Sequence, residues 1–162
     1  MYTNMKRLRF LFFLTALLLP LSLCARAQEP QEQDVQEERE LLAKAIYACT
    51  GQVSFCREWR LCIGELLLNR VASPEFPDTL EEVIYADETY CGKVEGYFAA
   101  ITPDSRAYAA ADRLLAGERV LNDPSVVWQN CHIYDGGVCK SYYDYRWGTI
   151  YFCRSPQQEL YW

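Results

Sequence analysis

The stretch "WRLCIGELLLNRVASPEFPDTLEEVIY", residues 59–85, decides the fold of this chain. Its apolar residues recur at steps of three and four, which predicts an amphipathic helix over residues 57–71 that buries one side. Pro74 and Pro77 follow and end that helix, because proline cannot continue one. The stretch therefore predicts a long packed helix followed by a sharp stop.

Two shorter helical patterns lie before and after the long helix. Residues 38–48 carry apolar side chains at helical spacing on one face, and Gly51 is the expected end of that helix. Thr79 and Glu82 form a Thr-x-x-Glu capping box, which predicts a short helix through about Tyr85.

The second half of the chain changes from a helical to a strand-like pattern. Residues 87–100 show no period, and we expect a long loop there. Thr102-Pro103-Asp104 predicts a helix start, with the helix running to Ala116. Residues 125–153 are rich in β-branched and aromatic residues around the turn signal Asp135-Gly136-Gly137, which predicts a small antiparallel sheet or a hairpin.

The N-terminal residues have the three parts of a secretory signal. A basic start is followed by an apolar run over residues 10–19 and by the small residues of Ala25-Arg26-Ala27. The run is shorter than the roughly 20 residues of a membrane span. We expect residues 1–27 to be a cleaved signal peptide. A lipid anchor on Cys24 and an uncleaved anchor are the less favoured alternatives.

Cleavage would leave a secreted or cell-envelope chain, Gln28–Trp162, without a stable membrane span. Its Gln/Glu-rich start, residues 28–37, is expected to be a solvated linker, and residues 38–162 are expected to form one domain. This mature chain has 12 basic and 22 acidic residues. The excess negative charge argues against nucleic acid as a partner. The oligomeric state stays open.

The cysteine count predicts disulfides. The seven cysteines of the expected mature chain are Cys49, Cys56, Cys62, Cys91, Cys131, Cys139 and Cys153. Their connectivity stays open, one cysteine is left over, and Cys131–Cys139 is the favoured single pair. A disulfide is also favoured over a Cys49–His132 catalytic dyad. No metal or cofactor is expected, because one histidine and scattered cysteines show no zinc spacing.

An ordered set of motifs carries a family resemblance. The motifs are Leu68-Asn69-Arg70-Val71, Phe76-Pro77-Asp78-Thr79, Val83-Ile84-Tyr85 and Thr102-Pro103-Asp104. In this order, and over about residues 40–152, the chain resembles the spore-cortex-lytic, germination-type cell wall hydrolases. The resemblance implies a compact, mostly helical, lysozyme-like α+β domain with a small C-terminal antiparallel sheet, here expected to be stapled by disulfides. It also implies cleavage of the glycan strand of peptidoglycan.

The chain departs from the family at its key residue. That residue is the first glutamate of Tyr-Ala-Glu, an acid that protonates the glycosidic oxygen. Here Tyr47-Ala48 is followed by Cys49, and the second family glutamate falls on Gln52. The closing Gly-x-His-x-Phe pattern appears as residues 148–152 with its histidine replaced. The segment between Tyr47 and Asn69 is also two residues longer than usual, which indicates a rebuilt site.

Other acids are candidates to replace the missing one. Glu58 lies at the start of the second helix, where an acid also simply stabilises the positive helix end. Glu65 lies in an apolar run, either with a raised pKa or in a salt bridge or solvent-facing position. Glu88 and Glu95, in the irregular segment, are weaker candidates.

Aromatic residues are the candidate substrate contacts. Tyr47, Trp128 and Tyr134 are assigned to glycan binding, although packing of the sheet explains many aromatics equally well. Two functions stay open: an enzyme with a relocated acid, and a noncatalytic module that binds glycan or a partner. The missing carboxylate favours the second.

Overall fold

The computed structural model describes residues 33–51, 57–86, 97–145 and 148–162. The predicted signal peptide and most of the linker lie outside this part of the chain. The same holds for five candidate residues: Gln52, Cys56, Glu88, Cys91 and Glu95. Residues Glu38–Trp162 form one compact unit. The described residues that precede it, 33–37, are helical and exposed.

The unit is an α+β fold, as expected. A first helix reaches residue 50. It is followed by α2 (Arg57–Val71), α3 (Leu80–Ala86), the single turn α4 (Tyr97–Ala100), α5 (Ser105–Leu115), β1 (Val126–Asn130), β2 (Val138–Asp144), β3 (Gly148–Arg154) and the short 3-10 helix η1 (Gln158–Tyr161).

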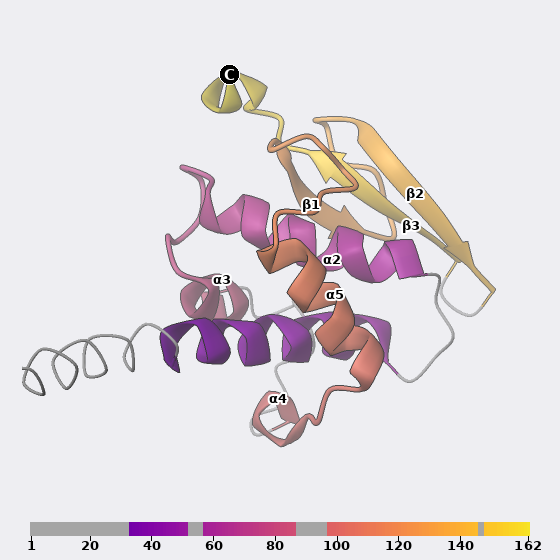
Figure 1. Cartoon of the computed structure of the whole chain (residues 1–162). Helices are drawn as coiled ribbons and strands as arrows, with labels where there is room; N and C mark the ends of the chain where they lie inside the picture. The colour runs from indigo at the N-terminus through magenta and orange to yellow at the C-terminus, as the bar shows by residue number, and fades with distance from the viewer. Residues whose placement is uncertain (1–32, 52–56, 87–96, 146–147) are drawn as a thin grey trace, which may run out of the picture. The chain divides into compact units, whose positions relative to one another are not determined.

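Helix α2 has the predicted bounds and is the central helix of the fold. It lies between the sheet and the first helix, and it contacts α3, α5 and β1 (Figure 1). Every residue from Trp59 to Leu67 is buried, so α2 is enclosed on nearly all sides and not on one side only, as the periodicity predicted. Gly64 permits the close packing: a Cβ atom there would lie 2.4 Å from Leu114 Cδ1 and 2.9 Å from Ile46 Cδ1.

Two predicted helix boundaries are confirmed by their hydrogen bonds. The Thr79 hydroxyl accepts the backbone N–H of Glu82 at 3.3 Å and donates to its carboxylate at 2.9 Å, which forms the expected capping box. Gly51 ends the first helix at φ 59°, and its N–H donates to the carbonyl of Tyr47 at 2.6 Å. This left-handed conformation suits glycine because it has no Cβ.

Two other boundaries differ from the prediction. Helix α5 begins at Ser105 and not near Thr102, because the capping group is Asp104. Its carboxylate accepts two backbone N–H groups of the first turn, at 3.0 and 2.9 Å. Residues 97–100, expected within a loop, form the helical turn α4. Residues 87–96 of the same expected loop lie outside the described residues.

The small antiparallel sheet is confirmed, with the strand order β1-β3-β2. The last strand in the sequence, β3, is thus the central one, and it is antiparallel to both neighbours. The hairpin joins β2 to β3 between Asp144 and Gly148. The turn at residues 135–137 belongs instead to the connection from β1 to β2, which are not neighbours.

This strand order explains why the favoured disulfide is wrong. Cys131 follows the end of β1 and Cys139 lies on β2, so β3 separates them by two strand spacings, about 10 Å. A disulfide needs Cα atoms closer than about 7 Å. Both thiols are free, as are those of Cys62 and Cys153. The prediction of a fold stapled by several disulfides is therefore not supported by the described residues.

Among the residues that the structure describes, no helix is long and apolar enough to cross a membrane.

Candidate functional site

Cys49, which the sequence resemblance sets at the position of the family glutamate, lies in the last turn of the first helix. It is half-buried and disulfide-bonded. Next to it, the buried Thr50 hydroxyl donates to the carbonyl of Ile46 at 2.7 Å. A disulfide sulfur neither donates a proton nor attacks as a thiolate, so Cys49 provides neither a general acid nor half of a dyad with His132.

Glu58 lies exposed in the first turn of α2, where it pairs with Lys140 of β2. The hydrogen bond from the Lys140 ammonium holds the pKa of Glu58 below its usual value. A general acid for glycoside cleavage needs the opposite shift, so that the carboxyl group keeps its proton near neutral pH. This ion pair therefore favours a carboxylate that is ionised and held in place.

Glu65 lies in the middle of α2 and is only 1% exposed. Its carboxylate accepts three consecutive backbone N–H groups from the segment after α5. They belong to Val120 at 2.5 Å, Leu121 at 2.8 Å and Asn122 at 2.9 Å. Both oxygens are engaged, and Asn122 takes the left-handed conformation, φ 52°. This geometry gives Glu65 a structural task, which is to hold the segment before β1 against α2.

The structure brings two of the predicted sugar-contact residues together in an aromatic row. The row consists of Phe76, Trp128, His132 and Tyr134. The rings of Trp128 and Tyr134 are stacked, with centroids 5.0 Å apart. Phe76 lies against Trp128 at 5.4 Å, and His132 against Tyr134 at 5.1 Å. The row passes from the segment after α2 to the end of β1 and beyond.

Arg70 supports one end of this aromatic row. It is 1% exposed, and its Nε–H donates to the carbonyl of Val127 at 2.7 Å. Its guanidinium carbon lies 4.9 Å from the ring centroid of Phe76 and 5.5 Å from that of Trp128. These are cation–π distances. The helical periodicity placed Arg70 on the buried side of α2, but sequence reasoning did not foresee that it orients aromatic side chains.

Tyr47, the third predicted sugar contact, is not one of the residues of the aromatic row. It lies on the first helix and packs, half-buried, against the hydrophobic core. Trp128 and Tyr134 are therefore the two predicted contacts that the structure joins.

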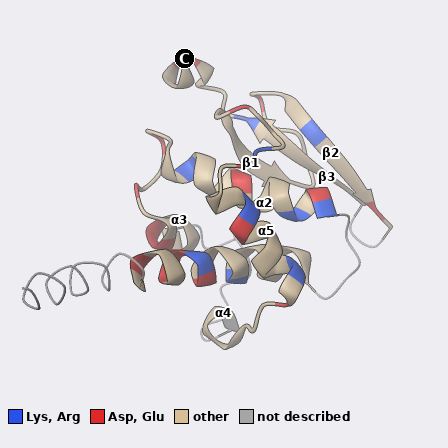
Figure 2. Cartoon of the chain, viewed as in Figure 1, with Lys and Arg blue, Asp and Glu red and all other residues tan. Residues whose placement is uncertain are grey.

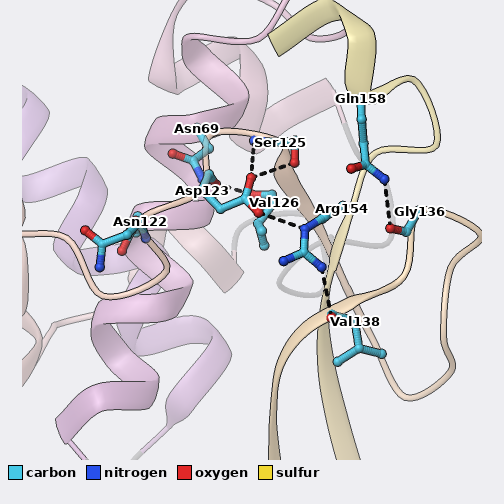
Figure 3. A network of polar contacts seen from close by, with 10 residues as sticks. Asn69, Asn122, Asp123, Ser125, Val126, Gly136, Val138, Arg154 and Gln158 are labelled. Carbon is cyan, nitrogen blue, oxygen red and sulfur yellow. Dashed lines mark hydrogen bonds and ion pairs between the residues drawn. The ribbon is translucent and has the colours of Figure 1, made fainter. Parts of the chain in front are cut away.

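A polar network joins the segment before β1 to α2 and to β3 (Figure 3). The Asn69 amide donates to the carbonyls of Asp123 at 3.0 Å and Val126 at 3.1 Å. The Asp123 carboxylate accepts the Ser125 hydroxyl at 2.6 Å and the Arg154 Nε–H at 2.8 Å. Asn69 and Arg70 are neighbours in the Leu-Asn-Arg-Val motif, so both polar residues of this motif hold the start of β1.

The network predicts a specific dependence of stability on pH. Burial raises the pKa of Asp123, but the hydrogen bonds from Ser125 and Arg154 outweigh it and leave that pKa below its usual value. The resulting stabilisation is fully present above the unfolded-state pKa of about 4 and is lost as the pH falls through the lower folded-state pKa. We expect Asp123→Asn to be less stable than the wild type at pH 7, with a difference that narrows below about pH 4. Urea unfolding at several pH values measures it, and parallel pH curves for the two proteins would contradict it.

Two of the free thiols, those of Cys62 and Cys139, are poorly suited to chemistry at neutral pH. Burial raises the pKa of Cys62 to about 11, and its sulfur lies 3.6 Å from the hydroxyl of Tyr142. Burial also raises the pKa of Cys139. No group of three or more His, Cys, Asp or Glu residues in the described ranges is placed to hold a metal ion.

The described unit is thus an α+β domain with a buried arginine on its Leu-Asn-Arg-Val helix, an aromatic row in contact with that arginine, and an anchored segment before the sheet. Residues 57–132 match the model of the Cell Wall Hydrolase family. The match supports the family that the ordered motifs resemble, and with it a peptidoglycan-related hydrolase domain. It begins at the first residue of α2 and therefore after Cys49. No curated protein and no solved structure matches the chain.

Proposed function

We propose that this protein is an exported relative of the cell wall hydrolases that binds the glycan strand of peptidoglycan without cleaving it at the family's usual position. One observation carries the proposal. The residue at the position of the family's general acid, Cys49, is disulfide-bonded. Cleavage of a glycosidic bond needs a proton donor for the leaving oxygen, and a disulfide has no proton to give.

The candidate replacement acids in the described residues favour the same proposal. Glu58 is paired with Lys140, and the carboxylate of Glu65 is buried and occupied by backbone donors. Two further carboxyl groups on α5 and its cap, Asp104 and Asp112, also have lowered pKa values. Lowered pKa values suit ion pairs and helix caps, whereas a general acid requires a raised one.

The aromatic row supplies the binding surface of this proposal. Flat aromatic faces stack on sugar rings, and the stacked pair Trp128 and Tyr134 is only half-buried, so part of its ring surface stays accessible. Arg70 lies against the ring of Trp128, and the Asn69 network holds the start of β1, the strand that carries Trp128. A preorganised surface of this kind binds without paying the entropy of ordering its side chains.

Binding and cleavage are separated by incubating the oxidised protein with insoluble peptidoglycan. We expect the protein to sediment with the polymer and to release no soluble muropeptides. Tyr134→Ala is expected to weaken the affinity by a factor of about 2 to 10, since one aromatic stacking contact contributes about 0.5–1.5 kcal/mol. Tyr143→Ala is the matched control, because Tyr143 is a 76% exposed tyrosine on β2 outside the aromatic row.

Two outcomes would overturn the proposal. Muropeptide release by the wild type that is lost in Glu58→Gln would identify an enzyme with a relocated catalytic carboxylate. Equal sedimentation of Tyr134→Ala, Tyr143→Ala and the wild type would remove the aromatic row as the binding surface.

A further inference from the structure

The short helix η1, near the C-terminus, contacts both connections that carry the ends of the aromatic row. Phe76 lies on the connection from α2 to α3, and Tyr134 lies on the connection from β1 to β2. Tyr161 of η1 bonds to the first connection, and Gln158 bonds to the second. We call residues 157–161 the C-terminal clamp.

A closed ring of hydrogen bonds joins Tyr161 to the connection from α2 to α3. The Tyr161 hydroxyl donates its one proton to the Glu75 carboxylate at 2.6 Å. The Ser73 hydroxyl lies 2.6 Å from the same phenolic oxygen and is therefore the donor in that contact. The Ser73 oxygen in turn accepts the backbone N–H of Glu75 at 3.1 Å. Three hydrogen bonds thus hold the backbone directly before Phe76.

This ring of hydrogen bonds is shielded from water. Ser73 is 5% exposed, and burial together with the hydrogen bond to Glu75 raises the pKa of Tyr161 to about 12. The Tyr161 hydroxyl therefore keeps its proton at neutral pH and stays a donor. Tyr161→Phe would remove two of the three bonds and would take this partner from the buried Ser73 hydroxyl, which destabilises the arrangement.

The second attachment holds the connection from β1 to β2. The side-chain amide of Gln158 donates to the carbonyl of Gly136 at 3.1 Å (Figure 3). Gly136 also packs tightly against the end of β3, where a Cβ atom would collide with the carbonyl oxygen of Arg154. The next residue, Gly137, donates its N–H to the carbonyl of Tyr134 at 3.0 Å. The far end of the aromatic row is thereby tied to the clamp.

The C-terminal clamp bonds through neutral side chains. Glu159 is the only charged side chain among residues 157–162, and Figure 2 shows this end of the chain mostly uncharged. The contacts to the two connections come from a hydroxyl and an amide. Added salt, which screens exposed ion pairs, is therefore not expected to release the clamp.

We propose that the C-terminal clamp sets the distance between the two ends of the aromatic row, so that Tyr161 and Gln158 are positioning residues for glycan binding. Neither residue belongs to the row, and each acts through the connection that it holds. A surface that is held in advance binds without the entropy cost of ordering its side chains. The ligand in this inference rests on the proposed function, whereas the positioning of the row can be measured without a ligand.

Near-ultraviolet circular dichroism of the full chain tests the positioning. Tyr161→Phe is expected to change the tryptophan signal, and to change it much less in a Trp128→Phe background, because Trp128 is the tryptophan of the row. Tyr143→Phe, the same change at an exposed tyrosine of β2, is the control and should leave the signal unchanged. A wild-type signal in Tyr161→Phe, or a change of equal size in both backgrounds, would overturn the proposal.

Sedimentation with insoluble peptidoglycan tests the consequence for binding. Tyr161→Phe and Gln158→Ala are each expected to weaken the affinity about two- to tenfold, the loss expected when one aromatic side chain must be ordered on binding. Glu159→Ala, at an exposed residue of the same short helix, should bind like the wild type. Wild-type affinity in both clamp variants would overturn the positioning role. If the wild type itself does not sediment, glycan binding fails, and the dichroism spectra alone decide whether the clamp holds the row.

Discussion

Replacement of Glu65 with alanine is expected to lower the free energy of unfolding by about 3–5 kcal/mol. The carboxylate of Glu65 satisfies three backbone N–H groups at once, and it is 1% exposed. Alanine leaves these donors without their acceptor and removes one of the contacts between α2 and the segment before β1. A buried donor that loses its partner costs about 1–3 kcal/mol. Urea unfolding followed by circular dichroism measures the change.

Two comparisons sharpen the Glu65 experiment. Glu58→Ala removes an exposed acid from the same helix and is expected to cost less than about 1 kcal/mol. Glu65→Gln keeps one acceptor oxygen but turns an amide N–H₂ toward backbone donors, so it should fall between the wild type and Glu65→Ala. A Glu65→Ala protein within 1 kcal/mol of the wild type would contradict the structural role. In a digestion assay, activity lost by Glu65→Gln must therefore be compared with its stability before chemistry is assigned.

Replacement of Arg70 with alanine is the second change expected to have a large effect, about 3–4 kcal/mol of unfolding free energy. Arg70 is fully enclosed, donates to Val127 and lies against the rings of Phe76 and Trp128. Its loss leaves a cavity and removes the hydrogen bond to the Val127 carbonyl. It also removes the group that the rings of Phe76 and Trp128 lie against. Urea unfolding gives the stability, and the near-ultraviolet circular dichroism of the folded variant reports the tryptophan environment.

The lysine variant distinguishes packing from charge at this position. Arg70→Lys keeps the positive charge, but an ammonium group cannot lie flat against the two rings or reproduce the guanidinium fork. We expect it to lose at least half of the stability that alanine loses. Arg57→Ala is the control, because Arg57 is an exposed arginine on the same helix, and it should lie within about 0.5 kcal/mol of the wild type. An Arg70→Lys protein as stable as the wild type would show that charge alone holds the site.

The helices were predictable because their signals are local. The bounds of α2 follow from the spacing of its apolar residues and from the prolines after it, and the capping box fixes the start of α3. The start of α5 was misplaced for a local reason as well. Thr102 and Asp104 both have side chains that can cap a helix. The carboxylate of Asp104, two residues further on, is the group that accepts two N–H groups of the first turn.

The site was less predictable because its contacts join distant parts of the sequence. Glu65 reaches backbone groups 55 to 57 residues away, and nothing beside it in the sequence indicates them. The Cys131–Cys139 pairing failed because a later strand inserts between the two cysteines.

The central place of β3 in the sheet has a consequence for the order of folding. β1 and β2 have no pairing with each other, so neither has a neighbouring strand until β3, the last strand in the sequence, is available. The pairing of Val126 with Arg154 also closes a long loop, which is slow compared with local helix formation. The helices can therefore assemble early during synthesis, while the sheet, and with it the support of the aromatic row, forms only after the final strand has been made.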